Sequence, residues 1–479
     1  MKRRKILLLT PPLVQTNSPY PATMHLAGWL NTRGVKWEQR DLSIKVVREI
    51  LLEHGDDVTE ELLEFLGGNA PWEKKRDASE RMDALALSIR ETVDREFGFG
   101  RYAEEKCRAV TDFGTLERLV RRRGVMDAPL ERHLEAAMAS ARPTEVWVTC
   151  PFPGTLVGAF KIAAYLRKRH PGVGLTLGGG YVNTELREMT DRRPYRYFDR
   201  FQYDSPVDSP FIAPDYRGID WEEYFDVVET DNFVANLWNS GKWVKLVMAQ
   251  GCYWHKCAFC DVCLPYIDRF RMPDASAVVD CLESFVGAKS GLTAPVSRFH
   301  FVDEAMPPAL IDSVCDEILR RGLEIEWWGN IRFDRAFTPR LAKKMAAAGC
   351  LAVTGGLECA NDRLLALMNK GITLASAEKV LKAFKAAGIF VHAYLMYGFP
   401  GETKSEQREA ERHVEDLAAR GLIQSAFWHR FALTVHSPIA KDPLRYGIRI
   451  TEPPRRADRV FARNELDFDI IRTKKGLTR

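Results

Sequence analysis

The chain has 479 residues, long enough for two or three domains, and its 46% hydrophobic content is ordinary for a globular protein with sizeable cores. A formal net charge of +4 is small for this length, so nucleic acid is not expected as a partner, because phosphate binding normally needs a concentrated basic face. Ten irregularly spaced cysteines indicate a reducing compartment. The apolar run before Pro11 and Pro12 is too short for a signal peptide and nothing else could span a bilayer, so we expect a cytoplasmic protein without a membrane partner.

The first forty residues read as a strand, a helix and a second strand. A buried strand is predicted over 5–10, stopped by the two prolines, with a helix over 21–32 and a strand over 37–41. Such a βαβ opening implies a parallel sheet that binds ligands at the carboxyl ends of its strands. Residues 44–142 are charged and helical in pattern, which predicts an inserted helical segment.

The strand and helix alternation resumes after the insertion. We predict strands over 145–150, 173–177 and 197–203, with helices over 156–169 and near 185–190. Three glycines, Gly178, Gly179 and Gly180, directly follow one of these strands. They could let the backbone approach a ligand or could simply form a tight turn, and the pattern alone does not separate the two.

The second half of the chain repeats strand and helix regularly after a proline-punctuated linker over 205–240. Its predicted strands fall at 243–249, 298–302, 324–330, 351–354, 390–396 and 425–433. Glycines 322, 349, 388 and 421 stand where helices would end. Six βα units predict an open, three-quarter TIM-like barrel, whose site would lie at the carboxyl ends of the strands.

The most informative stretch is residues 251–263, GCYWHKCAFCDVC, which follows the first strand of this second half. Cys252, Cys257 and Cys260 are spaced Cys-x4-Cys-x2-Cys, and thiolates this close repel one another unless a cation neutralises them. Structural zinc normally uses two separated Cys-x2-Cys pairs, and no second pair follows. A plant-type 2Fe-2S cluster has this spacing but needs a distant fourth cysteine. A 4Fe-4S cluster held by three thiolates would leave one iron open.

This loop, with the aromatic Phe259 before its last cysteine, resembles the radical S-adenosylmethionine (SAM) superfamily. The resemblance implies that Cys252, Cys257 and Cys260 hold a 4Fe-4S cluster whose open iron binds SAM. The cluster would then donate one electron and split SAM to a 5′-deoxyadenosyl radical. The usual spacing is Cys-x3-Cys-x2-Cys, so this chain has one extra residue in the first gap. Cys263 lies outside the triad and is expected to be an unligated thiol.

Further motifs of the superfamily stand at the ends of later strands. Asp303-Glu304 follows the second strand, a Gly-Gly-Leu-Glu stretch ends the fourth, and Gly-Phe-Pro-Gly-Glu-Thr follows the fifth. The resemblance implies that the glutamate of the fourth strand contacts the ribose and that a lysine twelve residues later meets the SAM carboxylate. The expected SAM-binding residues are Phe259, Glu304, Arg332, Glu358, Lys370, Gly398 and Phe399. The alternatives are a helix-cap role for the acidic pair, a structural ion pair for Arg332, and ordinary packing for His429 and His436.

Placed before such a barrel, the N-terminal half resembles the cobalamin-binding domains of many radical SAM enzymes. The expected cobalamin contacts are Pro12, Thr149, Thr155, Gly178, Gly179 and Gly180. Many such domains carry Asp-x-His-x-x-Gly to ligate cobalt. The nearest match here includes His25 and Gly28 but lacks the aspartate that would orient the imidazole. We therefore expect no protein imidazole on cobalt.

The resulting prediction is an α/β protein with a Rossmann-like, cobalamin-binding-type domain over 1–204, interrupted by the helical insertion. The linker would be followed by a partial (β/α)6 radical SAM barrel over 241–440 and an extension over 441–479. The predicted activity is cobalamin-dependent methylation of an unactivated carbon of a small molecule or peptide, with a flavodoxin or ferredoxin as electron donor. The alternatives are a radical rearrangement, cyclisation or ring contraction, and, from another class, an iron-sulfur electron carrier or a structural zinc protein.

Overall fold

The computed structural model describes residues 4–108, 110–292, 294–451 and 459–471. The chain folds as two compact units, each built from more than one segment. The first, called here the N-terminal unit, comprises Met1–Val244, Ser284–Val296 and Ala457–Arg463. The second, called here the barrel unit, comprises Lys245–Glu283, Ser297–Arg456 and Asn464–Arg479.

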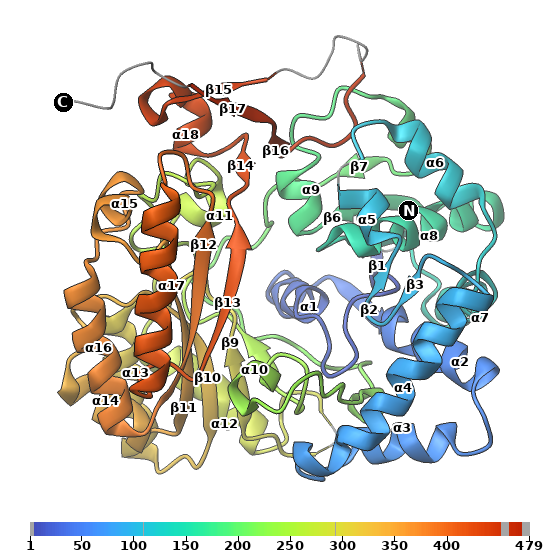
Figure 1. The fold of residues 1–479 in the computed structure, drawn as a ribbon. Helices are drawn as coiled ribbons and strands as arrows, with labels where there is room; N and C mark the ends of the chain where they lie inside the picture. The colour runs from blue at the N-terminus through green and yellow to red at the C-terminus, as the bar shows by residue number, and fades with distance from the viewer. Residues whose placement is uncertain (1–3, 109, 293, 452–458, 472–479) are drawn as a thin grey trace. The chain divides into compact units, whose positions relative to one another are not determined.

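The N-terminal unit is organised around a parallel sheet of five strands in the order β2-β1-β5-β6-β7 (Figure 1). The strands are β1 (Lys5–Thr10), β2 (Lys36–Asp41), β5 (Glu145–Thr149), β6 (Gly174–Gly178) and β7 (Arg200–Phe201). This is the doubly wound order in which the chain direction along the sheet reverses between two neighbouring strands, here β1 and β5. The Rossmann-like prediction is confirmed, and the crevice at the carboxyl ends of β1 and β5 is where such folds bind ligands.

Helices cover this sheet and form the insertion between β2 and β5. They are α1 (Ala22–Thr32), α2 (Leu42–His54), α3 (Thr59–Gly67), α4 (Trp72–Thr92), α5 (Glu104–Arg108), α6 (Phe113–Arg121), α7 (Asp127–Ala141), α8 (Leu156–Arg169), α9 (Gly180–Thr184) and α10 (Phe233–Asn236), with a small hairpin of β3 (Phe97–Gly98) and β4 (Arg101–Tyr102). The insertion is anchored by ion pairs that are almost fully buried, Lys75–Asp226 at 2.6 Å and Lys161–Asp127 at 2.7 Å. Breaking one such buried pair typically costs about 3–5 kcal/mol, so these pairs hold the insertion to the rest of the unit.

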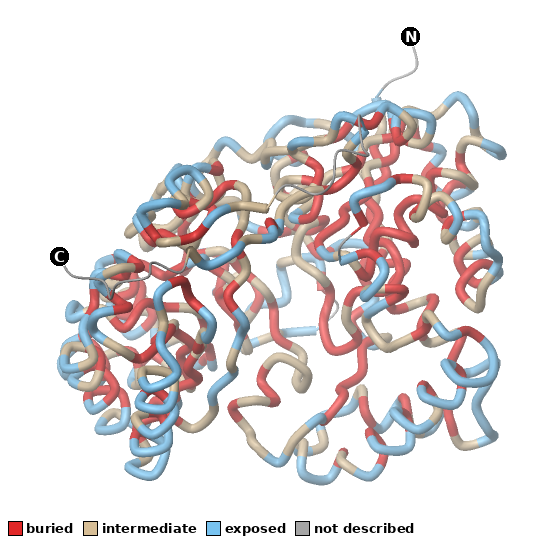
Figure 2. The backbone as a smooth tube through the Cα atoms, turned by 45° about the horizontal axis from the view of Figure 1, so that its top comes forward, coloured by how far each residue is buried: buried red, intermediate tan, exposed pale blue. Residues whose placement is uncertain are grey.

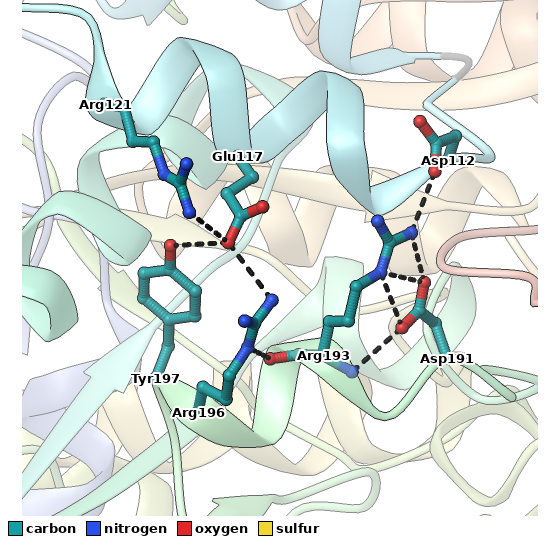
Figure 3. A network of polar contacts seen from close by, with 7 residues as sticks. All are labelled: Asp112, Glu117, Arg121, Asp191, Arg193, Arg196 and Tyr197. Carbon is teal, nitrogen blue, oxygen red and sulfur yellow. Dashed lines mark hydrogen bonds and ion pairs between the residues drawn. The ribbon is translucent and has the colours of Figure 1, made fainter.

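A polar network joins α6 to the 3-10 turn at Arg193–Arg196 (Figure 3). Arg193 lies between Asp191 and Asp112, donating to them at 2.6 and 2.9 Å. Next to it, Glu117 accepts from Arg196 at 3.2 Å and from Tyr197 at 3.3 Å. The network fixes α6 against the turn.

Two phenylalanines from distant segments complete the core of the N-terminal unit. Phe285 packs edge-on against Tyr216, with ring centroids 5.4 Å apart. Phe461 packs against Phe113 at 5.1 Å and Phe160 at 6.0 Å. Both phenylalanines are almost fully buried, so segments far along the chain supply part of this core.

The barrel unit contains a six-stranded parallel sheet in the order β13-β12-β11-β10-β9-β8. Its strands are β8 (Val244–Leu246), β9 (Arg298–Phe301), β10 (Glu326–Ile331), β11 (Cys350–Glu358), β12 (Phe390–Tyr397) and β13 (Ser425–Arg430). The helices are α11 (Pro265–Asp268), α12 (Ala275–Val286), α13 (Pro308–Arg321), α14 (Pro339–Ala347), α15 (Asp362–Leu367), α16 (Leu374–Ala387), α17 (Lys404–Ala419) and α18 (Pro438–Lys441). Helices α13, α14, α16 and α17 lie along one face of this sheet (Figure 1). The predicted partial (β/α)6 barrel is confirmed.

Burial follows the alternation expected of packed α/β layers (Figure 2). The apolar side chains of the central strands are buried, whereas residues on the outer turns of α16 and α17 are exposed. After β13 the chain adds two short antiparallel pairs, β14 (Leu433–Thr434) with β16 (Glu465–Leu466), and β15 (Ile448–Ile450) with β17 (Phe468–Ile470). Within the described part of the chain, no helix combines the length and the apolar character that crossing a bilayer requires.

Several predicted elements differ from the structure, among them the strand expected over 243–249, which is reduced to Val244–Leu246. The helix expected near 185–190 lies earlier, as α9, because Gly179 takes a φ of +107° and turns the chain into the helix directly after β6. The strand expected over 197–203 is reduced to the two residues of β7. The strand expected over 425–433 ends at Arg430, and the strand expected over 351–354 extends as far as Glu358.

Candidate active site

The cysteine loop follows β8, and its backbone is held in place at Gly251 and Cys252. Gly251 takes a φ of +76°, and a Cβ there would lie 2.9 Å from the backbone of Arg269, so glycine is required. The backbone N–H of Cys252 donates to the Ile267 carbonyl at 2.9 Å, and Cys252 also forms a parallel bridge with Ala305. The first cysteine is therefore held against the neighbouring strand end.

The extra residue between the first two cysteines is accommodated by a left-handed turn. His255 has a φ of +36°, and its Nδ1 lies 3.0 Å from the carbonyl oxygen of Cys252. The turn directs Trp254 over Gly371, where an added Cβ would come within 2.1 Å of the indole. In this turn the Trp254 ring lies on the segment that follows α15.

Three further hydrogen bonds tie the loop to that segment. Trp254 Nε1 donates to the Asn369 carbonyl at 2.8 Å, and Asn369 Nδ2 donates to the Lys256 carbonyl at 2.9 Å. The backbone N–H of Ala258 donates to the Met368 carbonyl at 2.8 Å. The loop is consequently docked on residues 368–371, next to Lys370.

The three cysteines lie in a setting with nearby positive charge. Cys257 is buried, and Cys252 and Cys260 are partly buried. Burial raises the pKa of the thiols of Cys257 and Cys260, while the charges of Lys370 and Arg332 act to lower that of Cys257. Arg332 Nη1 donates to Cys257 Sγ at 3.7 Å. Among the described residues, no group of three or more His, Cys, Asp or Glu side chains has the arrangement of a metal-ion site.

One buried donor at this site has no partner within the described part of the chain. Arg332 is 4% exposed, its Nη2 donates to the Lys370 carbonyl, and its Nε makes no hydrogen bond. A buried donor without an acceptor is costly, so an acceptor normally completes such a site. The sulfur atoms of an iron-sulfur cluster beside Cys257 would be acceptors of this kind, and in this respect the residues fit the cluster.

Cys263, the fourth cysteine of the loop, is exposed. Its Sγ lies 2.7 Å from Nζ of Lys441 on α18.

The end of β11 presents a buried ion pair that corresponds to two of the expected SAM contacts. Glu358 and Lys370 are in contact at 2.5 Å, with only 10% and 9% of their side chains exposed. The pairing of β11 with β12 shifts register between Gly356 and Glu358, and Glu358 takes a φ of +55°. A Cβ on Gly356 would lie 2.0 Å from Glu358 Oε1, so the Gly-Gly-Leu-Glu stretch makes room for its own glutamate.

Charge around Lys370 keeps its ammonium protonated. Burial acts to lower the lysine pKa, but Glu358 outweighs it and the pKa is raised. The site therefore offers a carboxylate and an ammonium side by side, which suit a vicinal diol and a carboxylate of a ligand.

The two acidic residues that follow β9, Asp303 and Glu304, have different environments. Asp303 is buried and its carboxylate accepts from the backbone N–H groups of Met248 and Ala249 at 2.8 and 2.6 Å, so it holds the end of β8. Glu304 has an exposed surface, but the protein around it removes water from the carboxyl group. This desolvation, together with the charge of Asp261, raises the pKa of Glu304 to about 7. Of the two, Glu304 is the side chain free to meet a ligand.

The turn after β12 contributes mainly backbone. Gly398 has a φ of +79°, and its N–H donates to Glu402 at 2.5 Å. Phe399 is buried, with its ring centroid 5.2 Å from that of Phe431, so its side chain belongs to the core. Phe259 is partly buried at the edge of the same apolar cluster, and its ring lies 5.7 Å from Lys370 Nζ.

Several residues around the site carried no sequence signal. Trp254 and Asn369 organise the loop, and Asn330 donates to the Asp303 carbonyl at 2.9 Å while accepting from Thr354 at 2.6 Å. These contacts depend on pairing between distant strands, which no local motif records.

His429 is exposed on β13, where its ring lies 5.5 Å from that of Tyr394. His436 follows β14 and is buried. The structure leaves both histidines without an assigned role.

In the N-terminal unit, two buried threonine hydroxyls lie where β1 and β5 end side by side. Thr10 and Thr149 are 1% and 4% exposed, and neither Oγ1 has a hydrogen-bond partner within the described residues. They follow a directly paired position of the two strands, Leu9 with Val148. Two unsatisfied hydroxyls at the point where strand order reverses fit the polar tail of a large ligand.

The other expected cobalamin contacts lie at or just after the ends of β1, β5 and β6, where the backbone is closely packed. A Cβ on Gly179 would lie 2.7 Å from Cys150, and one on Gly180 would lie 3.1 Å from the Pro151 carbonyl. A Cβ on Gly158 would lie 2.2 Å from the Pro12 carbonyl oxygen, and Gly178 ends β6. Thr155 is buried and donates to the Phe152 carbonyl at 2.8 Å, which leaves its hydroxyl engaged.

His25 lies on α1, and burial lowers its pKa to about 4.

Comparison with known sequences gives a match within the barrel unit. The profile of the Radical SAM superfamily matches residues 299–414. An uncharacterized methyltransferase of Pyrococcus horikoshii is 28% identical over 196 residues, which cover 40% of this chain and 40% of that protein. An anaerobic magnesium-protoporphyrin IX monomethyl ester cyclase of Cereibacter sphaeroides is 28% identical over 216 residues, 44% of this chain and 32% of the cyclase. The matches span less than half of these relatives' own length.

Comparison with solved structures extends over nearly the whole chain. The radical S-adenosylmethionine methyltransferase TsrM from Kitasatospora setae, solved with cobalamin and a 4Fe-4S cluster, superposes with a TM-score of 0.56 at 14% identity, covering 94% of this chain and 81% of TsrM. The cobalamin-dependent S-adenosylmethionine radical enzyme OxsB, solved with aqua-cobalamin and S-adenosylmethionine, gives 0.57 at 11% identity, covering 98% and 64%. At these identities the likeness shows a shared fold.

Proposed function

We propose that this chain is a radical SAM enzyme that uses a 4Fe-4S cluster, SAM and cobalamin to methylate an unactivated carbon of its substrate, a proposal supported by the match of residues 299–414 to the Radical SAM superfamily. The observation that carries the proposal is the docking of the cysteine loop beside the buried Glu358–Lys370 pair within one compact unit. This docking supports the proposal, because the loop that carries the three cysteines is hydrogen-bonded to the segment that carries Lys370.

The assignments at this site follow from the donor chemistry. Cys252, Cys257 and Cys260 would hold the cluster, which supplies, when bound, the electron that cleaves SAM to a 5′-deoxyadenosyl radical. Lys370 would bind the SAM carboxylate and Glu358 the ribose diol, both through charge-assisted hydrogen bonds. Glu304, the exposed member of its acidic pair, would meet the amino group, and the backbone of Gly398 and Phe399 would border the adenine. Phe259 would pack beside the cluster.

Cobalamin is the second cofactor of the proposal, and it would supply a carrier for the methyl group. Thr10 and Thr149 offer unsatisfied hydroxyls at the crevice between β1 and β5, and Gly179 and Gly180 let the segment after β6 pack closely against the backbone of Cys150 and Pro151. The fold shared with two cobalamin-containing structures supports this assignment. The substrate would be a small molecule or a peptide, and a flavodoxin or ferredoxin would supply electrons.

A second outcome is cyclisation without methyl transfer, with the same cluster and SAM chemistry. The specific observation in its favour is the likeness of the barrel to a magnesium-protoporphyrin monomethyl ester cyclase. Incubation of a metabolite pool with SAM carrying an isotopic methyl group distinguishes the two: methylation transfers the label into a product, whereas cyclisation leaves the product unlabelled.

The decisive experiment uses anaerobically reconstituted full-length protein. Iron and sulfide analysis should find four of each per chain, and addition of SAM with a low-potential reductant should release 5′-deoxyadenosine. Cys257→Ser should abolish cluster assembly and release, whereas the matched change Cys263→Ser, three residues beyond the loop triad, should retain both. Zinc in place of iron, or loss of the cluster only when Cys263 is changed, would refute the assignment.

Cobalamin binding is tested separately by visible spectroscopy. The protein should retain added cobalamin through gel filtration, and Thr149→Val, which removes one unsatisfied hydroxyl, should weaken binding about tenfold, since a hydrogen bond is worth about 1 kcal/mol or somewhat more. An exposed threonine, Thr92 on α4, provides the control as Thr92→Val. Failure of the wild-type protein to bind cobalamin would remove the methylation proposal and leave the radical SAM chemistry.

A further inference from the structure

Arg332 contacts both Cys257 and the segment bearing Lys370. It stands one residue beyond β10 and is buried. Nη1 donates to Cys257 Sγ and Nη2 to the Lys370 carbonyl. The sequence analysis expected Arg332 to bind SAM or to form a structural ion pair, whereas in the structure two of its donor atoms contact Cys257 and the Lys370 carbonyl.

The guanidinium is held in this position by aromatic rings. Its Cζ lies 4.7 Å from the centroid of the Trp254 ring and 6.0 Å from that of Tyr253. Trp254 is fixed in turn by its hydrogen bond to Asn369 and its close packing on Gly371. Both rings belong to the four residues between Cys252 and Cys257, so this gap contributes to the position of the arginine.

From this arrangement we propose that Arg332 is a positioning residue that sets the reduction potential of the cluster, by donating hydrogen bonds from a buried cation to Cys257 and to the adjacent cluster sulfur. The inference rests on the proposed function, because it assumes that the three cysteines hold a 4Fe-4S cluster. Its observational basis is the Nη1 contact with Cys257 and the unpartnered, buried Nε.

The direction of the effect follows from charge. Adding one electron to the cluster makes it more negative, and a nearby positive charge with N–H donors stabilises the reduced form more than the oxidised form. Hydrogen bonds to the sulfurs and solvent exposure are among the factors that set the potentials of such clusters. Arg332 should therefore ease the one-electron reduction by an external low-potential donor, and its loss should make reduction harder.

The test compares Arg332→Gln with wild type in the absence of SAM. Both reconstituted proteins are poised at the wild-type midpoint potential, and the reduced cluster is quantified by electron paramagnetic resonance. We expect the ratio of reduced to oxidised cluster to fall about tenfold in Arg332→Gln, which corresponds to about 59 mV for a one-electron couple. Arg332→Lys keeps the charge but cannot make the forked contacts, so it should fall about threefold.

Lys256 provides the matched control. It belongs to the same loop, is exposed, and places its Nζ 5.2 Å from the centroid of the Trp254 ring. Lys256→Gln removes the same charge from a position where solvent screens it, so the ratio should change less than twofold.

Each outcome decides the proposal. An unchanged ratio in Arg332→Gln, or an equal fall in Lys256→Gln, would overturn it. A change in SAM affinity without a change in the ratio would assign Arg332 to SAM and would overturn it as well. If Arg332→Gln does not retain iron, Arg332→Lys decides, and an unchanged ratio there would overturn the proposal. Failure of the wild-type protein to assemble a cluster would instead refute the proposed function, which separates the two failures.

Discussion

The Glu358–Lys370 pair permits a quantitative test of the site as a stability element before any cofactor is added. Both side chains are at least nine-tenths buried and in contact at 2.5 Å. Removing one partner of a buried pair leaves an uncompensated charge and typically costs about 3–5 kcal/mol. We therefore expect Lys370→Met to lower the free energy of unfolding of the cofactor-free protein by about 3–5 kcal/mol, measured by urea denaturation followed through tryptophan fluorescence.

The second half of the cycle separates the charge from the packing. Glu358→Gln combined with Lys370→Met leaves no buried charge, so the double variant should regain at least half of the loss, because apolar or neutral replacement of both partners is often nearly neutral. Asp416→Asn serves as the control in the same unit, since Asp416 pairs with Arg420 on the surface with 56% of its side chain exposed, and such pairs contribute about 0–1 kcal/mol. A cost below about 1 kcal/mol for Lys370→Met would refute the inference that the pair is a buried, coupled element.

Three further predictions concern other positions. Burial raises the pKa of Asp41 from 3.8 to about 6, so the folded state binds the proton more tightly, and stability should fall as pH rises between these values and stay level above them. Asp41→Asn should remove a penalty of about 2–3 kcal/mol at pH 7 that is small at pH 4, seen as a pH-dependent difference in urea midpoints from wild type. Gly371→Ala should expel Trp254 from its position, because the added Cβ would lie 2.1 Å from the indole, and the changed emission of Trp254 with reduced iron retention would report it. Gly179→Ala combines a φ of +107° with a Cβ 2.7 Å from neighbouring backbone, so it should lower the melting temperature and weaken cobalamin binding, whereas Gly172→Ala, which meets open space, should do neither.

The parts of the site that could be predicted are those written in short motifs. The cysteine spacing located the loop, and the Gly-Gly-Leu-Glu stretch with a lysine twelve residues later located a pair that the structure brings into contact. The alternation of apolar strands with amphipathic helices predicted both sheets, because the apolar pattern of a strand is local and does not depend on which strands it pairs with.

The remaining features depend on pairing between distant segments. The target of Arg332 is fixed by Trp254, whose position depends on Gly371, and no window of sequence contains all three. The turn that ends β13 at Arg430 reflects a hydrogen bond from the Phe431 N–H to the Tyr397 carbonyl, while Leu433 pairs with Leu466. A local pattern of apolar residues does not distinguish one long strand from two short strands.

The interleaving of the two units along the chain constrains how the protein can be dissected. Phe285 and Phe461 belong to the core of the N-terminal unit, although they are encoded on the far side of residue 244. A fragment ending at that residue would lack both rings, and deleting a buried phenylalanine side chain typically costs about 3–5 kcal/mol. Such a fragment would start with a deficit comparable to the whole stability of a small domain, so transferring the N-terminal unit to another barrel would require these two later segments as well.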